Sequence, residues 1–161
     1  MLKYFKIELF KYEGMEYMKT GIEFSRKVLL AYSAMCKPLC KELGLPQTAF
    51  DILMFLANNP EYKTASDIVE MRHIKANLIS VNVDRLVNDG YLERNAVKGD
   101  RRKTELVCTE KALPIVERGR QLQQNFSERI FLDADDEVRE AFFSALSVMN
   151  KNLDKILEEN C

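Results

Sequence analysis

The chain has 161 residues, enough for one compact domain or for a small lobe joined to a helical lobe, and too few for two independent enzymatic domains. Its formal net charge is −1, so nucleic-acid binding must depend on local clusters of cations. No uncharged run approaches the roughly twenty residues of a membrane span, and Lys3, Lys6, Glu8 and Lys11 argue against a secretory signal. We therefore expect a cytoplasmic protein without membrane association.

The first third of the chain has the apolar spacing of helices. Residues 1–18 alternate aromatic and charged side chains, which fits a helix or a strand, and we treat them as an N-terminal extension. Apolar residues at helical spacing predict a helix from Gly21 to Leu43, which Pro38 should kink or shorten. A second helix is expected from Gln47 to Ala57, with Pro46 in its first turn.

Two short amphipathic segments follow, with a tight break between them. The first, Ala65–Met71, begins behind Thr64, whose hydroxyl can cap the amides near Asp67. The second runs from about Lys75 to Asn88 and ends before Gly90, a residue suited to a left-handed terminator. Its apolar stripe is Ile79, Val83, Leu86 and Val87. The short break forces the two helices to cross steeply and to share one core, which predicts a helix-turn-helix.

A strand, a basic loop and a second strand come directly afterwards. Tyr91–Arg94 and Lys103–Thr109 alternate apolar and polar residues as half-buried strands do. The loop expected between them, residues 95–102, has Gly-Asp at its tip with a lysine before it and two arginines after it. A cationic hairpin beside a helix-turn-helix is a wing, which can reach phosphates or the minor groove while the second helix enters the major groove.

Two long amphipathic segments end the chain. Thr109 is expected to cap a helix to about Phe131, with its start delayed by Pro114, and Asp133 is expected to cap a last helix. The apolar stripes are Ile115, Gly119, Leu122, Phe126 and Ile130 in the first, and Val138, Phe142, Leu146, Met149, Leu153 and Ile156 in the second. These stripes exceed what a small winged lobe can cover. A second copy of the chain is the simplest partner, so we expect a homodimer; the alternative is that both helices fold back on the first helix within a monomer.

Four motifs in and just after the winged unit resemble the multiple antibiotic resistance regulator (MarR) family of bacterial transcription factors. They are Val83-Asp84-Arg85-Leu86, then Asp89-Gly90-Tyr91-Leu92-Glu93-Arg94, then Asp100-Arg101-Arg102, then Thr109-Glu110-Lys111, in the family's order and spacing. The chain departs from the pattern at Val81, where many members carry a basic or polar residue, and at Cys108 and Ala112.

The resemblance implies a mainly α fold with a small β-hairpin wing, a winged helix-turn-helix with N- and C-terminal dimerisation helices. Residues 46–109 would form the DNA-binding lobe, and residues 19–45 and 110–161 the helical dimerisation region. It also gives Arg101 and Arg102 a DNA-facing role, with Asp100 orienting an arginine by a charge-assisted hydrogen bond. The alternative for this wing sequence is a solvated run of charges.

The second helix of the turn can present a reading face. With Ile79 and Val83 buried, a rotation of about 100° per residue directs Asn77 and Val81 outward, with Leu78, Ser80 and Arg85 on the shoulders. Asn77 can read an adenine edge, Ser80 can meet a base or a phosphate, and Leu78 and Val81 can pack on thymine methyl groups. The predicted DNA contacts are Arg72, His73, Lys75, Asn77, Leu78, Ser80, Val81, Arg85, Asp100, Arg101, Arg102 and Lys103. An ion pair with Asp89 is the alternative for Arg85. Two-fold symmetry predicts double-stranded DNA with an inverted-repeat operator.

Regulation is less visible in the sequence. In the MarR family, small ligands or cysteine oxidation alter the spacing of the two DNA-binding lobes. Candidate pocket residues for a small-molecule effector are Tyr32, Met35, Phe50 and Met54, which are otherwise core residues. Cys36 and Cys40 lie four apart on one helix, so they are either a redox pair or small hydrophobes. The four cysteines form no C-x-x-C pair, which suits a reducing compartment.

Sequence features of catalysis are few. His73 is the only histidine, and no P-loop, nucleophile elbow or H-E-x-x-H motif occurs, so we expect neither an enzyme, a cofactor nor a dedicated zinc sensor. The sequence predicts a dimeric, sequence-specific transcriptional regulator, a repressor released or modulated by a small ligand. The alternatives are a winged-helix protein-interaction module without DNA binding, a thiol-based redox regulator, and a dimerisation lobe of the kind found in some methyltransferases.

Overall fold

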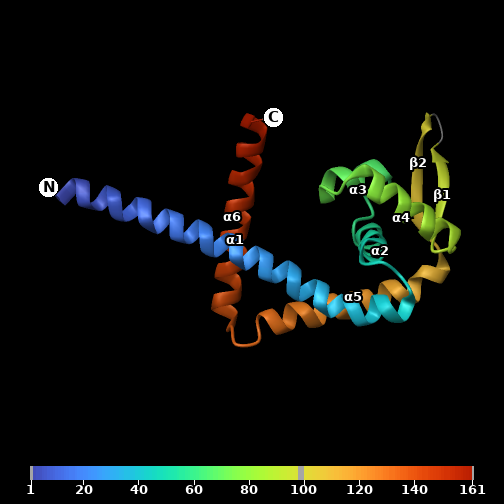
Figure 1. Cartoon of the computed structure of the whole chain (residues 1–161), viewed down its shortest axis with the longest axis horizontal. Coiled ribbons are helices and arrows are strands. Elements are labelled where there is room, and N and C mark those ends of the chain that lie inside the picture. Colours follow the sequence, from blue (N-terminus) through green and yellow to red (C-terminus); the bar gives the residue numbers. More distant parts are fainter. Residues whose placement is uncertain (1, 98–99, 161) are drawn as a thin grey trace. The chain divides into compact units, whose positions relative to one another are not determined.

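The computed structural model describes the backbone of residues 2–97 and 100–160, and the side chains of residues 16, 18–97 and 104–160. Helices dominate, and a two-stranded antiparallel hairpin lies between the fourth and fifth long helices (Figure 1). The elements are α1 (Leu2–Leu43), α2 (Gln47–Asn58), α3 (Ala65–Arg72), α4 (Ala76–Asn88), β1 (Leu92–Val97), β2 (Asp100–Cys108), η1 (Glu110–Ala112), α5 (Leu113–Ile130) and α6 (Asp136–Asn160). The predicted fold class is confirmed. No helix in the described part of the chain is long and apolar enough to cross a membrane.

The chain forms two compact units, Met1–Leu122 and Gln123–Cys161. The first contains α1 to α4, the hairpin and the first half of α5. The second contains the end of α5 and the whole of α6.

Helix α1 is longer than the sequence analysis predicted. It runs unbroken from Leu2, so the described part of the 1–18 extension is helical and continuous with the expected helix. Pro38 lies inside α1, which continues five residues beyond it to Leu43, so the prediction that Pro38 shortens the helix was wrong. Gly44, at a φ of 64°, ends α1 as expected. Pro46 is the N-cap of α2 rather than a residue of its first turn.

The core of the first unit is built around α2. Phe50 and Leu53 of α2 are completely buried, and around them lie Ile68 of α3, Leu86 of α4 and Leu106 of β2, each at most 5% exposed. Every one of these elements contributes one apolar face, so none is stable alone and the lobe folds as a unit.

The first half of α5 is fixed to this core by close contact and by arginines. A Cβ atom at Gly119 would lie 2.2 Å from Met54 Sδ and 3.1 Å from Phe50 Cζ, so any larger residue would force these side chains of α2 to shift. Arg118 donates two hydrogen bonds to the Glu42 carboxylate, at 2.8 and 2.7 Å. This pairing lowers the pKa of Glu42 and raises that of Arg118. Arg120 donates to the Ala57 carbonyl at the end of α2, at 2.9 Å.

The hairpin is longer than predicted. Its strands pair antiparallel from Leu92↔Cys108 to Ala96↔Thr104, with an irregularity between Ala96 and Val97. Residues that the sequence analysis assigned to a loop over 95–102 therefore belong largely to strands, and that boundary was wrong. The hairpin is joined to the lobe by the Leu106 amide, which donates to the Lys63 carbonyl at 2.7 Å.

The second unit begins in α5 and turns into α6. The Asp135 carboxylate accepts from the Val138 amide at 2.8 Å, so Asp135 caps α6, and the prediction that Asp133 does so was wrong. Phe131, Phe142 and Phe143 form an aromatic cluster with centroids 5.4 to 5.5 Å apart. No described residue of α6 is buried.

Candidate nucleic-acid interface

The helix-turn-helix consists of α3 and α4, and its first helix has the predicted cap. The Thr64 hydroxyl accepts from the Asp67 amide at 3.1 Å, while the Asp67 carboxylate accepts from the Thr64 amide at 2.8 Å. This reciprocal capping box satisfies amides at the start of α3. His73 ends α3 at a φ of 50°, in the left-handed region, and so sets the turn into α4.

One face of α4 is buried in the lobe, as predicted. Ile79, Val83 and Leu86 are at most 2% exposed. Asn82 is buried with them, and its side-chain NH2 group donates to the Leu78 carbonyl, one turn earlier, at 2.8 Å. The sequence analysis did not foresee a polar residue there; the local hydrogen bond offsets the cost of burying its NH2 group.

The opposite face of α4 is exposed. Asn77, Leu78, Ser80 and Val81 all point away from the core, with Val81 66% and Leu78 45% exposed. The Leu78 amide donates both to the Asn77 carboxamide oxygen, at 2.9 Å, and to the Lys75 carbonyl, at 3.0 Å, in the first turn of α4. Asn77 and Val81 are exposed as predicted, and Leu78 and Ser80, predicted on the shoulders of the helix, are exposed as well. Contact of these four side chains with DNA remains a prediction.

Cations flank the N-terminal end of α4. Arg72 at the end of α3 and Lys75 at the start of α4 are exposed, and the uncharged turn residue His73 between them is exposed as well. This end of a helix carries the positive end of the helix dipole and unsatisfied amides, so cations and dipole together favour an anion such as a phosphate.

The two charged residues within α4 are both engaged inside the lobe. Asp84 forms an ion pair with Arg94 of β1. Arg85 donates to the Gly44 carbonyl at 2.8 Å and lies 3.6 Å from the Asp89 carboxylate. The ion pair considered as the alternative to phosphate binding by Arg85 is therefore present. Neither the Asp84–Arg94 pair nor the Arg85–Gly44 contact was predicted, because both join elements whose approach depends on the fold.

The C-terminal end of α4 is held by two residues from the start of the next helix. Lys111 donates to the Asp89 carbonyl at 2.7 Å and lies over the Tyr91 ring, 4.8 Å from its centroid. The Thr109 hydroxyl donates to the Gly90 carbonyl at 2.7 Å. Thr109 thus does not cap the following helix with its side chain, as the sequence analysis expected. A cation and a hydroxyl at these carbonyls stabilise the end of α4.

The wing cations fall outside the described side chains. Asp100, Arg101, Arg102 and Lys103 belong to β2, whose backbone is described, but their side chains are not. Their predicted role in DNA binding remains a prediction.

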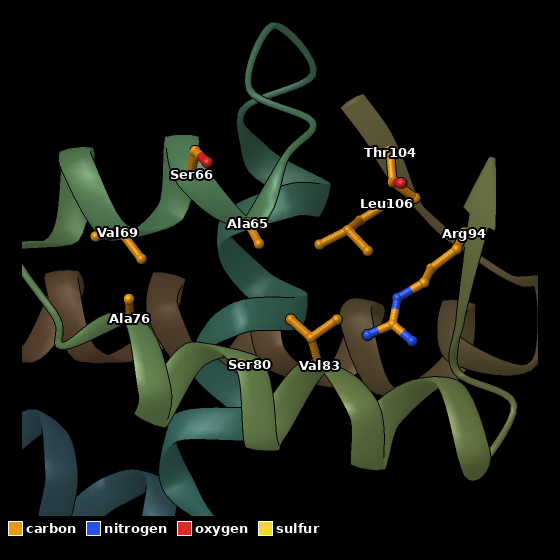
Figure 2. A pocket seen from close by; sticks show the side chains of 9 residues that line it. All are labelled: Ala65, Ser66, Val69, Ala76, Ser80, Val83, Arg94, Thr104 and Leu106. Carbon is orange, nitrogen blue, oxygen red and sulfur yellow. The ribbon is translucent and has the colours of Figure 1, made fainter. Parts of the chain in front are cut away.

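A cavity of about 290 Å³ lies between α3, α4 and the hairpin. Its floor is apolar, and Ser66, Ser80, Thr104 and Arg94 bring polar groups to it (Figure 2). The full lining is Ala65, Ser66, Val69, Ala76, Ser80, Val83, Arg94, Thr104 and Leu106. Ser80 therefore borders this cavity as well as the exposed face of α4.

The residues predicted to form an effector pocket lie elsewhere. Phe50 and Met54 are buried in the core against Gly119, and Tyr32 and Met35 are half-buried on α1. None of the four lines the cavity of Figure 2. The pocket around them remains a prediction.

Cys36 and Cys40 are buried at the end of α1. Burial raises the pKa of both thiols, that of Cys40 to about 11. Because oxidation proceeds through the thiolate, buried thiols with raised pKa values react slowly. Their environment is that of small hydrophobes. Cys108 is half-buried, and burial raises its pKa as well.

The fold and the exposed α4 define a winged helix-turn-helix protein. Residues 43–103 match the MarR family, so the winged lobe is of MarR type and the resemblance is confirmed. No curated protein matches the chain.

Solved structures of MarR proteins have the same fold across most of the chain. A MarR regulator from Methanosarcina mazei Go1 is 20% identical, with 88% of this chain and 99% of that one covered and a TM-score of 0.71. A MarR-family regulator from Listeria monocytogenes complexed with 26mer DNA is 17% identical, with 78% and 83% covered and a TM-score of 0.70. A MarR protein from Peptoclostridium difficile DA00132 is 22% identical, with 79% and 84% covered and a TM-score of 0.66. At these identities the similarity shows the fold.

Proposed function

We propose that this protein is a cytoplasmic, homodimeric, sequence-specific DNA-binding regulator of transcription that acts as a repressor and responds to a small-molecule effector. The observation that carries the proposal is the pair of faces on α4. One face is buried at Ile79, Val83 and Leu86, and the other is exposed beside a hairpin, as a major-groove reading helix must be.

The charges around α4 support DNA as the partner. Arg72, His73 and Lys75 lie at its N-terminal end, and the sequence of β2 begins with Arg101, Arg102 and Lys103 close behind Asp100. Arg72 and Lys75 beside an uncharged reading face suit phosphates at the edge of a groove, and the sequence of β2 supplies further cations. The solved Listeria monocytogenes relative bound to 26mer DNA supports the same function.

DNA binding is tested by selecting duplexes from a random pool with the full-length protein and measuring affinity against salt. We expect an inverted repeat and an affinity that falls steeply between about 50 and 200 mM salt, because each phosphate contact releases counterions. Arg102→Ala should weaken binding on all sequences, while Asn77→Ala should alter base preference. A stable protein with no salt-dependent binding to any duplex would favour the protein-interaction alternative.

Homodimerisation would use residues 19–45 and 110–161. In α6 most of the predicted stripe is exposed: Val138, Met149, Leu153 and Ile156 are each 50 to 54% exposed, while Phe142 and Leu146 are half-buried. Such a continuous apolar stripe on a charged helix is typical of an interface.

The dimer is tested by light scattering on Leu153→Asp, with Asn152→Asp as its matched control. Asn152 is exposed next to Leu153 but lies off the stripe. We expect the wild type and Asn152→Asp to be dimers at micromolar concentration, and Leu153→Asp to be a monomer with weakened operator binding. A wild-type chain that is monomeric at that concentration would exclude the dimer.

The effector is proposed to act by changing the position of α4. An occupant of the cavity in Figure 2 would contact Ser80 on α4 and Thr104 on the hairpin together. Small amphipathic molecules can be screened for release of the operator, and Val69→Phe, which fills the cavity, should abolish any release that occurs there. Release that is unaffected by Val69→Phe would instead direct attention to Tyr32 and Met35.

A further inference from the structure

The residue types on the exposed face of α4 limit which bases this helix can read. From Ala76 to Asn88 the charged residues are Asp84 and Arg85 alone, and the exposed middle of the helix is Leu78, Ser80 and Val81. Protein helices most often read guanine with arginine or lysine, and cytosine with a carboxylate. Whether α4 can read G·C pairs in this way therefore depends on whether the Asp84 and Arg85 side chains are free to contact bases.

Both charges are committed to other parts of the lobe. The Arg85 guanidinium is held by the Gly44 carbonyl at 2.8 Å and by Asp89 at 3.6 Å, toward the end of α1 and the last turn of α4. The Asp84 carboxylate is neutralised by Arg94 from β1. These contacts fix α4 in the lobe, and they leave its reading face without a charged group for guanine or cytosine.

The remaining groups favour a methyl group over a polar edge. Val81 is 66% exposed and Leu78 is 45% exposed, and the two are three residues apart, so their side chains are neighbours on one face. The C5 methyl of thymine is the apolar feature of the major groove. Asn77 uses its carboxamide oxygen on the Leu78 amide, and its NH2 group can donate to N7 of either purine, to O6 of guanine or to O4 of thymine, so it is compatible with both kinds of base pair.

We infer that Val81 and Leu78 are specificity-determining residues that read thymine methyl groups, and that the base pairs under the middle of α4 are T·A pairs. This inference rests on the proposed DNA-binding function. It names the class of operator that this chain prefers and assigns the preference to two apolar side chains. Arg72 and Lys75 lie outside this central region and serve the phosphates at its edge.

The test removes the thymine methyl group from the DNA and, separately, truncates Val81 or Leu78 in the protein. Duplexes are first selected from a random pool with the full-length protein, and each thymidine of the selected half-site is then replaced by deoxyuridine, which lacks only the C5 methyl. We expect at least one replacement in each half-site to weaken binding about fourfold, the effect of one buried methyl group. In Val81→Ala the thymidine and deoxyuridine duplexes should bind equally at that position. Leu78→Ala should remove the discrimination at a neighbouring thymine.

Val148→Ala is the matched control. Val148 is 59% exposed on α6, outside the winged lobe. Any weakening of the dimer in this variant would lower the affinity for both duplexes alike, so the ratio between thymidine and deoxyuridine binding should stay that of the wild type. Circular dichroism establishes that the alanine variants remain folded, which is expected because alanine favours the helix.

The outcomes separate this inference from the proposed function. A selected inverted repeat with G·C pairs at the centre of each half-site, or with equal binding of thymidine and deoxyuridine duplexes by the wild type, overturns the inference and leaves DNA binding intact. Discrimination that survives in both Val81→Ala and Leu78→Ala overturns the assignment to these residues. A protein that enriches no duplex removes the proposed function and the inference together.

Discussion

The winged lobe and the last helix treat their apolar residues in opposite ways. In the lobe, Leu53, Leu86 and Ile68 are at most 1% exposed, and the helices α2, α3 and α4 close around them. In α6, Leu153 and Leu157 are 53% and 58% exposed, and no described residue is buried. Both regions have helical apolar spacing, so the pattern alone does not tell a closed core from an open face.

The stability of the single chain and its assembly with a partner therefore depend on different regions. Burial of apolar area within one chain stabilises the lobe without a partner, whereas the stripe on α6 gains stability only when another surface covers it. Substitutions in the lobe should therefore change the free energy of unfolding. Substitutions on the α6 stripe should change how the oligomeric state depends on protein concentration.

The largest effect should come from a core leucine. Leu53→Ala is expected to lower the free energy of unfolding by about 2–5 kcal/mol, through reduced apolar burial and the cavity left behind. Leu157→Ala, the exposed counterpart on α6, should change it by less than about 0.5 kcal/mol. Urea unfolding followed by circular dichroism measures both. Equal losses would mean that α6 is as buried as the lobe and would break the comparison.

One helix cap in the lobe and one at the start of α6 test whether the two regions unfold independently. Thr64→Ala removes the side chain that accepts from the Asp67 amide and should cost the lobe about 1 kcal/mol. Asp135→Ala removes the equivalent bond to the Val138 amide at the start of α6. We expect this second change to increase hydrogen exchange at the start of α6 while the lobe unfolds as in the wild type. A loss of lobe stability in Asp135→Ala would show that the two regions unfold together.

Arg85 tests whether the lobe positions α4 from within. Arg85→Ala should weaken operator binding about fivefold, the effect expected of an exposed charged hydrogen bond near 1 kcal/mol, with an unchanged salt slope. Arg72→Ala should instead reduce the slope of log affinity against log salt by about 0.9 for each phosphate that the variant no longer neutralises. Gel shifts at several salt concentrations give both slopes. If Arg85→Ala instead reduced the slope of log affinity against log salt, Arg85 would be a phosphate-binding residue.

The smallest effect should come from the buried thiols. The pKa of Cys40 is raised to about 11 from an ordinary 9.0, so as pH rises above 9 the unfolded chain loses this proton first. The contribution of this thiol to stability is therefore present below pH 9 and falls as the pH rises from 9 to 11. Urea unfolding at pH 8 and 10 should show a smaller fall in Cys40→Ala. An equal fall in both proteins would mean that Cys40 titrates normally.

Residue patterns alone were enough to predict the order and type of the elements within the winged lobe. The stripe of Ile79, Val83 and Leu86, the cap at Thr64 and the stop at Gly90 are local signals, and the structure has all of them. Local signals suffice here because periodicity and capping act within one or two helical turns. They failed at boundaries: strands extend into the expected loop, α1 begins at Leu2 and not near Gly21, and Asp135 replaces Asp133 as a cap.

Only the tertiary structure decided which charged groups of α4 are engaged. Asp84 meets Arg94 from the hairpin, and Arg85 meets Gly44 from the end of α1, forty-one residues away. It also decided that Met54 lies against Gly119. No spacing rule reaches across such separations, because these contacts exist only after several elements close around a shared core. The reading face of α4 is consequently a product of the whole lobe, although its side chains are consecutive in the sequence.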